Sequence, residues 1–510
     1  MKKISIIMLL LLALLLSACG AGQPTAGSTG STGSTASTGI SCSSHTDEND
    51  DGGCDKCAVS VMVSIDLYAI NDLHGKLADG DTHVGVDELT TYLKAAQATQ
   101  NTIFLSVGDM WQGTSESNLT QGLIITDWMN ELGFAAMALG NHEYDWGEEA
   151  ICANDALAQF PFLAINIYDR ETDSRVDYCD ASVVVEINGV QIGIIGAMGD
   201  CYSSIASDKT QDVYFVTGSS LTKLVKEESQ RLRQEEGVDF VVYTIHDGYG
   251  SNTSSTLTGS QLRSYYDISL SDGYVDLVFE GHSHQKYAVA DEKGVWHLQH
   301  RGDNSGGISH VQVSINSVTG TWKIEEAELV STGTYASLED DPIVEQLLSK
   351  YDDSISPAKR VVGINRSYRS SDELCDLVAQ LYYELGRSEW GDEYTIVLGG
   401  GFLSCRSPYH LAAGEVLYGD LQAVFPFDND LVLCSVKGSD LLSKFINTSN
   451  SRYHIFGSWG NIDPNGTYYI VVDTYTATYA PNRLTIVEEY TPGIYARDLL
   501  ADYIAAGGME

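Results

Sequence analysis

Five short clusters of His, Asp and Asn could act together as a metal-binding site. They are Asn71-Asp72-Leu73-His74-Gly75, Gly108-Asp109, Gly140-Asn141-His142-Glu143-Tyr144-Asp145, His246-Asp247-Gly248 and Gly281-His282-Ser283-His284. Their donors suit Zn²⁺, Mn²⁺ or Fe²⁺, and the lack of Cys in the clusters argues against a structural zinc site. Two Asp at strand ends, one Asn and five His give eight candidate ligands, more than one tetrahedral ion needs. The clusters therefore predict two divalent ions that share a carboxylate.

Each cluster alone has an ordinary explanation. An Asp after a strand is usually a turn residue or a helix cap, and a lone His is usually a hydrogen-bonded side chain. Here, however, the patterns D-x-H, G-D, G-N-H-E-x-D and G-H-x-H follow one another in that order. This joint occurrence favours one shared site over several unrelated turns.

Each cluster follows an apolar run that predicts a strand. The runs cover residues 61–70, 102–107, 134–139, 238–245 and 275–279. Near-continuous apolar runs predict strands buried on both faces, and residues 221–236 have helical composition. Ligands of α/β sheets bind beyond the carboxyl ends of the strands, so the clusters are expected to meet at one edge. Asn188-Gly189 predicts a hairpin turn between residues 183–187 and 190–196.

Length and charge limit the class of protein. The chain has 510 residues and 43% hydrophobic residues, which at about 150 residues per domain predicts two or three globular domains. Lys and Arg number 29 against 70 Asp and Glu, a net charge of −41. This charge disfavours binding to polymeric nucleic acid, which needs clustered cations. A small anionic substrate stays possible where a bound cation reverses the local field.

The N-terminus predicts export. Lys2 and Lys3 precede an apolar run, residues 4–16, that is too short to span a bilayer, and small residues surround Cys19. This segment resembles a bacterial lipoprotein signal, which implies removal of residues 1–18 and lipidation of Cys19. An ordinary signal peptide with an incidental Cys is the alternative. Because no other segment is apolar enough to span, we expect an extracytoplasmic protein held to the bacterial cell membrane by lipid only.

Residues 19–60 are expected to form a flexible tether. Residues 20–44 are almost all Gly, Ser, Thr and Ala, a composition that behaves as a random coil. An acidic stretch, residues 47–57, has the spacing of half a calcium loop, but Ala58 stands at position 12 instead of Glu. Cys54 and Cys57 could bind a metal or form a disulfide, with Cys42 as a further partner, although a solvated acidic linker is the favoured interpretation.

The clusters named above resemble the signature of calcineurin-type metallophosphoesterases. Over about residues 61–500 the chain more closely resembles the secreted 5′-nucleotidase/UDP-sugar hydrolase family. The resemblance implies an α/β fold, a four-layer αββα sandwich over residues 61–335 followed by a smaller α+β C-terminal domain. It also implies roles for particular residues: Asp72, His74 and His284 as ligands of one metal, Asn141, His246 and His282 as ligands of a second, Asp109 as the bridge, and His142 with Asp145 as the catalytic pair.

The C-terminal part resembles the family less closely. A linker helix is expected within residues 336–361, followed by a substrate-recognition domain over 362–510. The resemblance implies that the glycine turn containing Gly400 and the side chain of Arg406 hold the nucleotide, and that Phe427 stacks on the base; Phe427 as core is the alternative. Leu398 replaces the family's usual Asn, and the second stacking motif is not visible, so that Tyr475 or Tyr479 is the candidate substitute.

The sequence therefore predicts a membrane-anchored dinuclear-metal phosphoesterase, and the family resemblance implies that it releases phosphate from nucleoside monophosphates. Cyclic nucleotides, nucleotide sugars, NAD and non-nucleotide phosphoesters stay open as substrates because the predicted substrate pocket departs from the family pattern. A surface binding module without turnover is the alternative from another class. The intact set of metal ligands opposes it.

Overall fold

The computed structural model describes residues 44–57, 59–79, 84–249, 274–302, 308–406, 408–478, 484–490 and 493–509. Contacts group residues 45–510 into one compact unit. The predicted export signal, the lipidation residue Cys19, Cys42 and Tyr479 lie outside the described residues. Within the described ranges, no helix has the length and apolar character needed to cross a bilayer.

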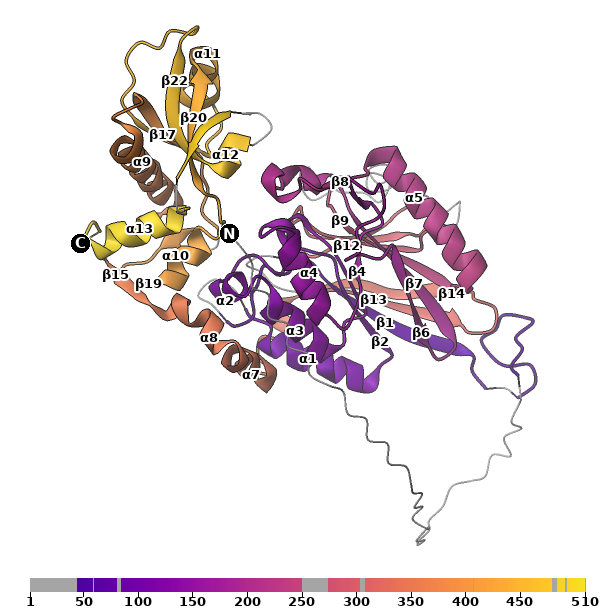
Figure 1. Cartoon of the computed structure of the whole chain (residues 1–510). Coiled ribbons are helices and arrows are strands. Elements are labelled where there is room, and N and C mark those ends of the chain that lie inside the picture. The colour runs from indigo at the N-terminus through magenta and orange to yellow at the C-terminus, as the bar shows by residue number, and fades with distance from the viewer. Residues whose placement is uncertain are drawn as a thin grey trace, which may run out of the picture. The chain divides into compact units, whose positions relative to one another are not determined.

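Two six-stranded mixed sheets form the first part of the fold (Figure 1). The first has the order β14 (Trp322–Val330), β13 (Ile308–Asn316), β1 (Met62–Ile70), β2 (Thr102–Ser106), β3 (Ala136–Ala138) and β4 (Phe162–Leu163). The second has the order β11 (Tyr287–Ala290), β12 (Trp296–Gln299), β10 (Leu277–Glu280), β9 (Phe240–His246), β7 (Val190–Met198) and β6 (Ser182–Ile187). Strands β1 to β4 run parallel, as do β7, β9, β10 and β12, so their carboxyl ends share an edge in each sheet.

The two sheets pack face to face between two layers of helices. Alternate residues of β1 point to opposite faces: Leu67 packs in the core between the sheets, and Tyr68 packs in the core under the helices. That helical layer contains α1 (Asp87–Thr99), α3 (Leu123–Leu132) and α4 (Glu148–Leu157), and α5 (Gly218–Arg231) covers the second sheet. The predicted αββα sandwich is confirmed.

The local predictions for this part are also confirmed. The apolar runs before the five polar clusters form β1, β2, β3, β9 and β10. The predicted hairpin is β6–β7, with Asn188 at φ 51° and Gly189 at φ 83°, the left-handed conformations that a two-residue hairpin turn requires. The predicted helix over 221–236 is α5, which continues into a π-helical turn over Leu232–Glu236.

A helical segment leads into the C-terminal part. Helix α7 (Pro342–Lys350) lies inside the predicted linker-helix region, and the Asp341 side chain caps it by accepting from the Ile343 N–H at 3.0 Å. Val344 and Leu347 pack into the core under the first sheet. Helix α8 (Asp352–Ile355) follows. The boundaries 61–335 and 362–510 stay predictions.

A five-stranded sheet organises the C-terminal part. Its order is β21 (Tyr453–Gly457), β17 (Ile396–Phe402), β22 (Thr467–Asp473), β20 (Leu431–Lys437) and β23 (Thr485–Glu489). Helix α9 (Ser371–Trp390) packs on one face, and its start is fixed by a reciprocal capping box between Ser370 and Glu373. Short strands and helices complete this part: β15 (Val361–Asn365), β16 (Arg369–Ser370), β18 (His410–Leu411), β19 (Gly414–Leu417), α10 (Tyr418–Val424), α12 (Thr474–Thr478) and α13 (Ala496–Ala505).

The N-terminal loop, which we define as the described residues among 44–60, differs from the solvated linker favoured by the sequence. Asp47 and Cys54 are each only 3% exposed. The Asp47 carboxylate accepts from Asn316 Nδ2 at 2.6 Å, at the end of β13, so the loop is folded onto the first sheet. Burial would raise the pKa of the Cys54 thiol, but hydrogen bonds from the Thr46 backbone and from the His45 side chain outweigh it and lower the pKa to about 5.

Candidate metal centre

The strands of both sheets bring the predicted metal ligands to one edge. Asp72 and His74 follow β1, and Asp109 follows β2. Asn141 and His142 begin a 3₁₀ turn, Asn141–Tyr144, after β3. His246 is the last residue of β9, and His282 and His284 follow β10.

The backbone at this edge is unusual. Five of the predicted ligands have left-handed backbone with φ between 51° and 67°: Asp72, His74, Asp109, His282 and His284. A non-glycine residue in this region is sterically strained, and such strain persists where surrounding contacts hold it. Here the Asp72 N–H donates to the Gly108 carbonyl, and the His74 N–H donates to the Asp109 carbonyl, both at 3.0 Å. The strain is thus fixed by bonds between neighbouring strand ends.

Three groups of donors share this edge, and one of them, Cys201 with His246 and His282, includes a thiol. Ligand atoms of Asp72, His74 and His284 lie within 4.8 Å of one another, and so do those of Asp72, Asp109 and His246. His246 Nε2 lies 3.1 Å from Asp109 Oδ2, and His284 Nε2 lies 3.3 Å from Asp72 Oδ1. His282 lies beside His246, with ring centroids 5.6 Å apart. The structure therefore brings together carboxylates and imidazoles from four strand ends.

Two imidazoles are oriented by backbone carbonyls. His74 Nδ1 lies 2.8 Å from the Gln112 carbonyl oxygen, and His246 Nδ1 lies 2.6 Å from the Val107 carbonyl oxygen. Because a carbonyl oxygen only accepts, each Nδ1 must carry the proton. This leaves Nε2 of both rings available as a ligand atom: His246 Nε2 faces Asp109 Oδ2, and His74 Nε2 lies 3.4 Å from His284 Nε2, the arrangement found in metal-ligating histidines.

The electrostatics of the cluster favour a bound cation. Asp72 is fully buried and Asp109 is 1% exposed. Burial alone would lower the pKa of His246, but the charge of Asp109 outweighs it and raises the pKa to about 10. Burial lowers the pKa of His282 to about 4, so this ring is a neutral donor. The buried carboxylates thus draw positive charge into the site.

The donor set fits a divalent ion. The Oδ1 atom of Asn141 is buried and has no hydrogen-bond partner among the residues that the structure describes. An unsatisfied buried acceptor next to carboxylates and neutral imidazoles is well suited to a cation. These residues could therefore hold divalent metal through Asp, Asn and His.

The predicted catalytic pair lies beside the cluster. His142 Nδ1 is 2.8 Å from Asp145 Oδ2, and the backbone N–H of His142 donates to Asp109 Oδ1 at 2.8 Å. Burial opposes a charge on His142, but the carboxylates of Asp145 and Asp109 outweigh it and raise its pKa. On its other side, Arg406 Nη2 donates to His142 Nε2 at 2.9 Å. His142 thus joins the metal-ligand cluster to a residue of the C-terminal part.

A cavity of about 510 Å³ lies next to this pair. Asn141, His142, Asp145 and His282 line one side, and Arg406 and Phe427 line the other. The ring of Phe427 stacks on that of His142, with centroids 5.8 Å apart and an interplanar angle of 20°, and Arg406 Cζ lies 5.4 Å from the Phe427 ring. Two of the predicted substrate-binding residues therefore lie at the cavity.

Gly400 does not line the cavity. It lies inside β17, where an added Cβ would come within 2.2 Å of the His454 carbonyl oxygen and 2.7 Å of Ala379 Cβ. The glycines at this position allow α9 and β21 to approach β17 closely, so their role in the structure is packing. Tyr479 is outside the described residues, but Tyr475, the other candidate, lines the cavity.

Sequence reasoning missed several residues at the cavity. Phe402 and Tyr475 form an aromatic pair with centroids 5.8 Å apart, and Arg452 Cζ lies 5.7 Å from the Phe402 ring. Lys209, from the first part of the chain, also lines the cavity. Tyr475 was already a candidate, and of the residues that were missed only Phe402 carried a sequence signal, its place directly after the glycine run. Arg452 and Lys209 come from segments with no recognisable motif.

Glu143 is another residue that the sequence analysis did not single out. Its buried carboxylate accepts from the N–H groups of Gly140 at 2.6 Å, Asp109 at 2.9 Å, Met110 at 2.8 Å and Trp111 at 3.4 Å. The side chain therefore ties the loop after β2 to the loop after β3. Its place inside the G-N-H-E-x-D motif was the available signal.

Comparisons with known proteins agree with this fold. The calcineurin-like phosphoesterase family model matches residues 67–286. Protein UshA of Yersinia enterocolitica is 26% identical over 430 residues, which cover 74% of this chain and 74% of UshA. An apyrase of Tabanus yao is 31% identical over 240 residues, which cover 43% of this chain and 39% of the apyrase. The structure of a 5′-nucleotidase precursor from Thermus thermophilus has a TM-score of 0.63 at 21% identity and covers 87% of this chain and 96% of that chain.

We predict that Glu143→Gln destabilises the protein. Oε1 accepts from Met110 and Trp111, whereas Oε2 accepts from Asp109 and Gly140, so an amide nitrogen on either side would face two N–H donors. Leaving such buried groups unsatisfied costs about 1–3 kcal/mol, to be measured as the free energy of unfolding in urea. Glu149→Gln on the exposed side of α4 is the matched control and should change little. Equal stability of both variants would contradict the role of Glu143.

Proposed function

Because residues 67–286 are a calcineurin-like phosphoesterase domain and the protein is a phosphoester hydrolase, we propose that it releases phosphate from nucleoside monophosphates. The observation that carries this proposal is the cavity. It joins the Asp, Asn and His cluster, through His142, to a wall that offers Arg406 and aromatic rings. These two surfaces suit a substrate that places its phosphate at the cluster and its base against the aromatic rings.

We propose that the cluster holds two divalent ions, zinc, manganese or iron. The ligands are Asp72, His74 and His284 for one ion, Asn141, His246 and His282 for the other, and Asp109 between them. When bound, such a pair of ions neutralises charge on phosphoryl oxygens and lowers the pKa of a water molecule, which makes a nucleophile available near neutral pH. The buried carboxylates and carbonyl-oriented imidazoles supply the matching charge and geometry.

His142 acts as the residue that contacts the phosphoryl group or the leaving oxygen. Asp145 accepts from Nδ1, which fixes the ring and leaves Nε2 pointing to the cavity. In the structure Nε2 accepts from Arg406. A substrate phosphate lying between these two side chains would accept from Arg406 and, with the imidazole protonated as its raised pKa favours, from Nε2–H as well, so their contact marks the position proposed for the phosphate.

The aromatic side chains of the cavity suit a nucleobase. Phe427 lies near the proposed phosphate position, and Phe402 with Tyr475 forms a second apolar surface in the same cavity. Arg452 and Lys209 add cations for the negative charge of the substrate. These contacts are the basis for preferring a nucleotide to a small aliphatic phosphoester.

We also propose that the protein works outside the cytoplasm, tethered by lipid on Cys19. The basis is the N-terminal sequence alone: a lipoprotein-like signal, then a Gly/Ser/Thr segment over residues 20–44. A coil of that length spans roughly 25–30 Å by the square-root rule, enough to hold the enzyme clear of a bilayer. In this organisation residues 61–335 carry the chemistry and residues 362–510 recognise the substrate.

The direct test is hydrolysis of AMP by the purified protein with added Mn²⁺, repeated with EDTA. We expect phosphate release that EDTA abolishes and that added metal restores. p-Nitrophenyl phosphate serves as a general phosphoester substrate, and a cyclic nucleotide, a nucleotide sugar and NAD test the other substrate classes. Activity on p-nitrophenyl phosphate but not on AMP would overturn nucleotide specificity, and no activity on any of them would favour a binding module.

We predict that His142→Ala lowers kcat about 10²–10⁴-fold, the usual contribution of an acid or an electrostatic stabiliser. The ligands of both ions remain, so metal content measured by elemental analysis should stay at the wild-type value. His410→Ala, a half-buried histidine on β18, is the control and should keep full activity. Unchanged turnover of the His142 variant would remove this residue from the mechanism.

The proposed roles of Arg406 and Phe427 can be distinguished by the choice of substrate. Loss of a hydrogen bond to a charged group costs about 1.5–3 kcal/mol, so Arg406→Ala should lower kcat/KM roughly 10- to 100-fold for both AMP and glycerol phosphate. Phe427→Ala should lower kcat/KM for AMP only, because base stacking contributes about 1–3 kcal/mol. Arg387→Ala and Phe456→Ala, outside the cavity lining, are the matched controls. Equal losses for both substrates in Phe427→Ala would rule out base stacking.

A further inference from the structure

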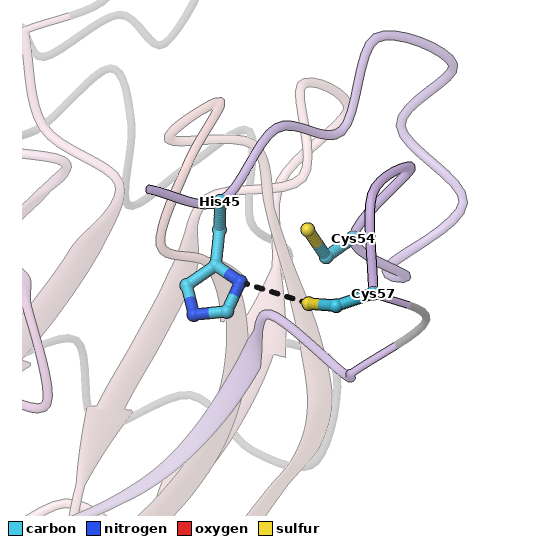
Figure 2. Close-up of side chains that lie close together, drawn as sticks. All are labelled: His45, Cys54 and Cys57. Carbon is cyan, nitrogen blue, oxygen red and sulfur yellow. Dashed lines mark hydrogen bonds between the residues drawn. The ribbon is translucent and has the colours of Figure 1, made fainter. Parts of the chain in front are cut away.

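Three side chains of the N-terminal loop converge away from the candidate metal centre. Ligand atoms of His45, Cys54 and Cys57 all lie within 4.8 Å of one another. Figure 2 shows the two sulfur atoms and the Nδ1 edge of the imidazole facing one another, with Cys57 Sγ 3.5 Å from His45 Nδ1. The donors thus come from two separate stretches of the loop and meet at one point.

The backbone holds this arrangement. Cys54 and Cys57 are the ends of a tight turn in which the Cys57 N–H donates to the Cys54 carbonyl at 3.2 Å. The turn closes a narrow hairpin, since the Cys54 N–H donates to the Val59 carbonyl at 2.8 Å and Gly53 bridges Ser60. The Asp55 N–H donates to the Thr46 carbonyl at 2.8 Å, which attaches the turn to the stretch that carries His45.

The carboxylates of Asp47 and Asp50 form hydrogen bonds away from the His45, Cys54 and Cys57 group. Asp47 accepts from the N–H groups of Asp51 and Gly52 and from Asn316 Nδ2. Asp50 accepts from Asn316 at 2.9 Å and from the hydroxyl groups of Thr319 and Thr321 at 2.9 and 2.6 Å, on the turn between β13 and β14. These bonds hold the loop on the sheet and occupy the carboxylate of Asp47, the residue at position 1 of the calcium-loop spacing. The donors that converge are instead sulfur and imidazole nitrogen.

We propose that His45, Cys54 and Cys57 bind a zinc ion. Thiolate and imidazole ligands select Zn²⁺ among common divalent ions, whereas Mg²⁺, Ca²⁺ and Mn²⁺ prefer oxygen. A C-x-x-C turn with a histidine from a second segment supplies three of the four tetrahedral positions. The fourth is left to a water molecule or another donor.

The proposed zinc site is separate from the candidate metal centre. It lies before the first residue of β1, Met62, whereas Asp72 follows the last residue, Ile70. A nine-residue strand is about 30 Å long, so the two sites lie at opposite ends of β1. The zinc ion therefore fixes the N-terminal loop where the chain enters the sheet, and the phosphoesterase reaction does not depend on it.

X-ray absorption at the zinc edge tests the proposal on the full-length protein reconstituted with Zn²⁺. Zinc–sulfur distances of about 2.3 Å differ from zinc–nitrogen and zinc–oxygen distances of about 2.0–2.2 Å, and the proposed phosphoesterase ligands include no sulfur. We expect a zinc–sulfur component in the wild type that is lost in the double variant Cys54→Ser/Cys57→Ser, with one zinc fewer per chain. Cys152→Ser, at an exposed cysteine of α4, is the matched control and should keep both features. Phosphate release should be equal in all three proteins.

His45→Ala is a second variant, suited to the case in which loss of both cysteines unfolds the loop. His45 is exposed, so its replacement should leave the fold intact. Because even the loss of outer partners of a metal ligand costs about 10–100-fold in affinity, we expect at least a tenfold weaker zinc affinity in metal-buffered titrations. A zinc–sulfur component of undiminished amplitude in Cys54→Ser/Cys57→Ser, or wild-type affinity in His45→Ala, would overturn the proposal. So would a Cys54–Cys57 disulfide, seen by mass spectrometry as the loss of two hydrogens.

Discussion

Two carboxylates, Asp72 and Asp109, are buried at the edge where the strands of both sheets end. A buried charge costs several kcal/mol unless opposite charge and hydrogen bonds compensate for it. The surroundings supply this compensation. The His246 ring lies against the Asp109 carboxylate. The backbone N–H of His282 donates to Asp72 at 3.0 Å, and that of His142 donates to Asp109 at 2.8 Å. The same pairing draws segments that are far apart in the sequence to one point, which is why the candidate metal centre and a cavity lie there.

Much of this arrangement could be predicted from the sequence, because the signals were local. Apolar runs that end in polar residues mark buried strands, and the rule for strand ends in α/β sheets places the polar clusters together. The turn at Asn188-Gly189 could be predicted because few other residue pairs adopt two successive left-handed conformations easily. What the local pattern does not contain is the tautomer of each imidazole. That depends on carbonyls such as Val107 and Gln112, which belong to neighbouring loops.

The predictions were weaker where contacts join distant segments. The acidic residues of the N-terminal loop suggested a solvated linker, but Asp47 is paired with Asn316, 269 positions further along. The glycine run around Gly400 suggested a substrate-binding turn, whereas the close approach of His454 and Ala379 makes it a packing site. Arg452 and Phe402 meet at the cavity only because β17 and β21 are neighbours in the sheet. A single sequence carries no signal for such pairings.

The Glu143 carboxylate, which accepts from four backbone N–H groups, has a consequence for how ions would exchange at the candidate metal centre. It fixes the loop after β2 to the loop after β3, so hydrogen bonds within the protein itself set the spacing of Asp109, Asn141 and His142. The conformational entropy of these loops is then lost once, when the chain folds, and is not lost again each time a metal ion binds. A vacated centre would refill without rebuilding its walls, so the enzyme could tolerate fluctuating supplies of trace elements in its surroundings.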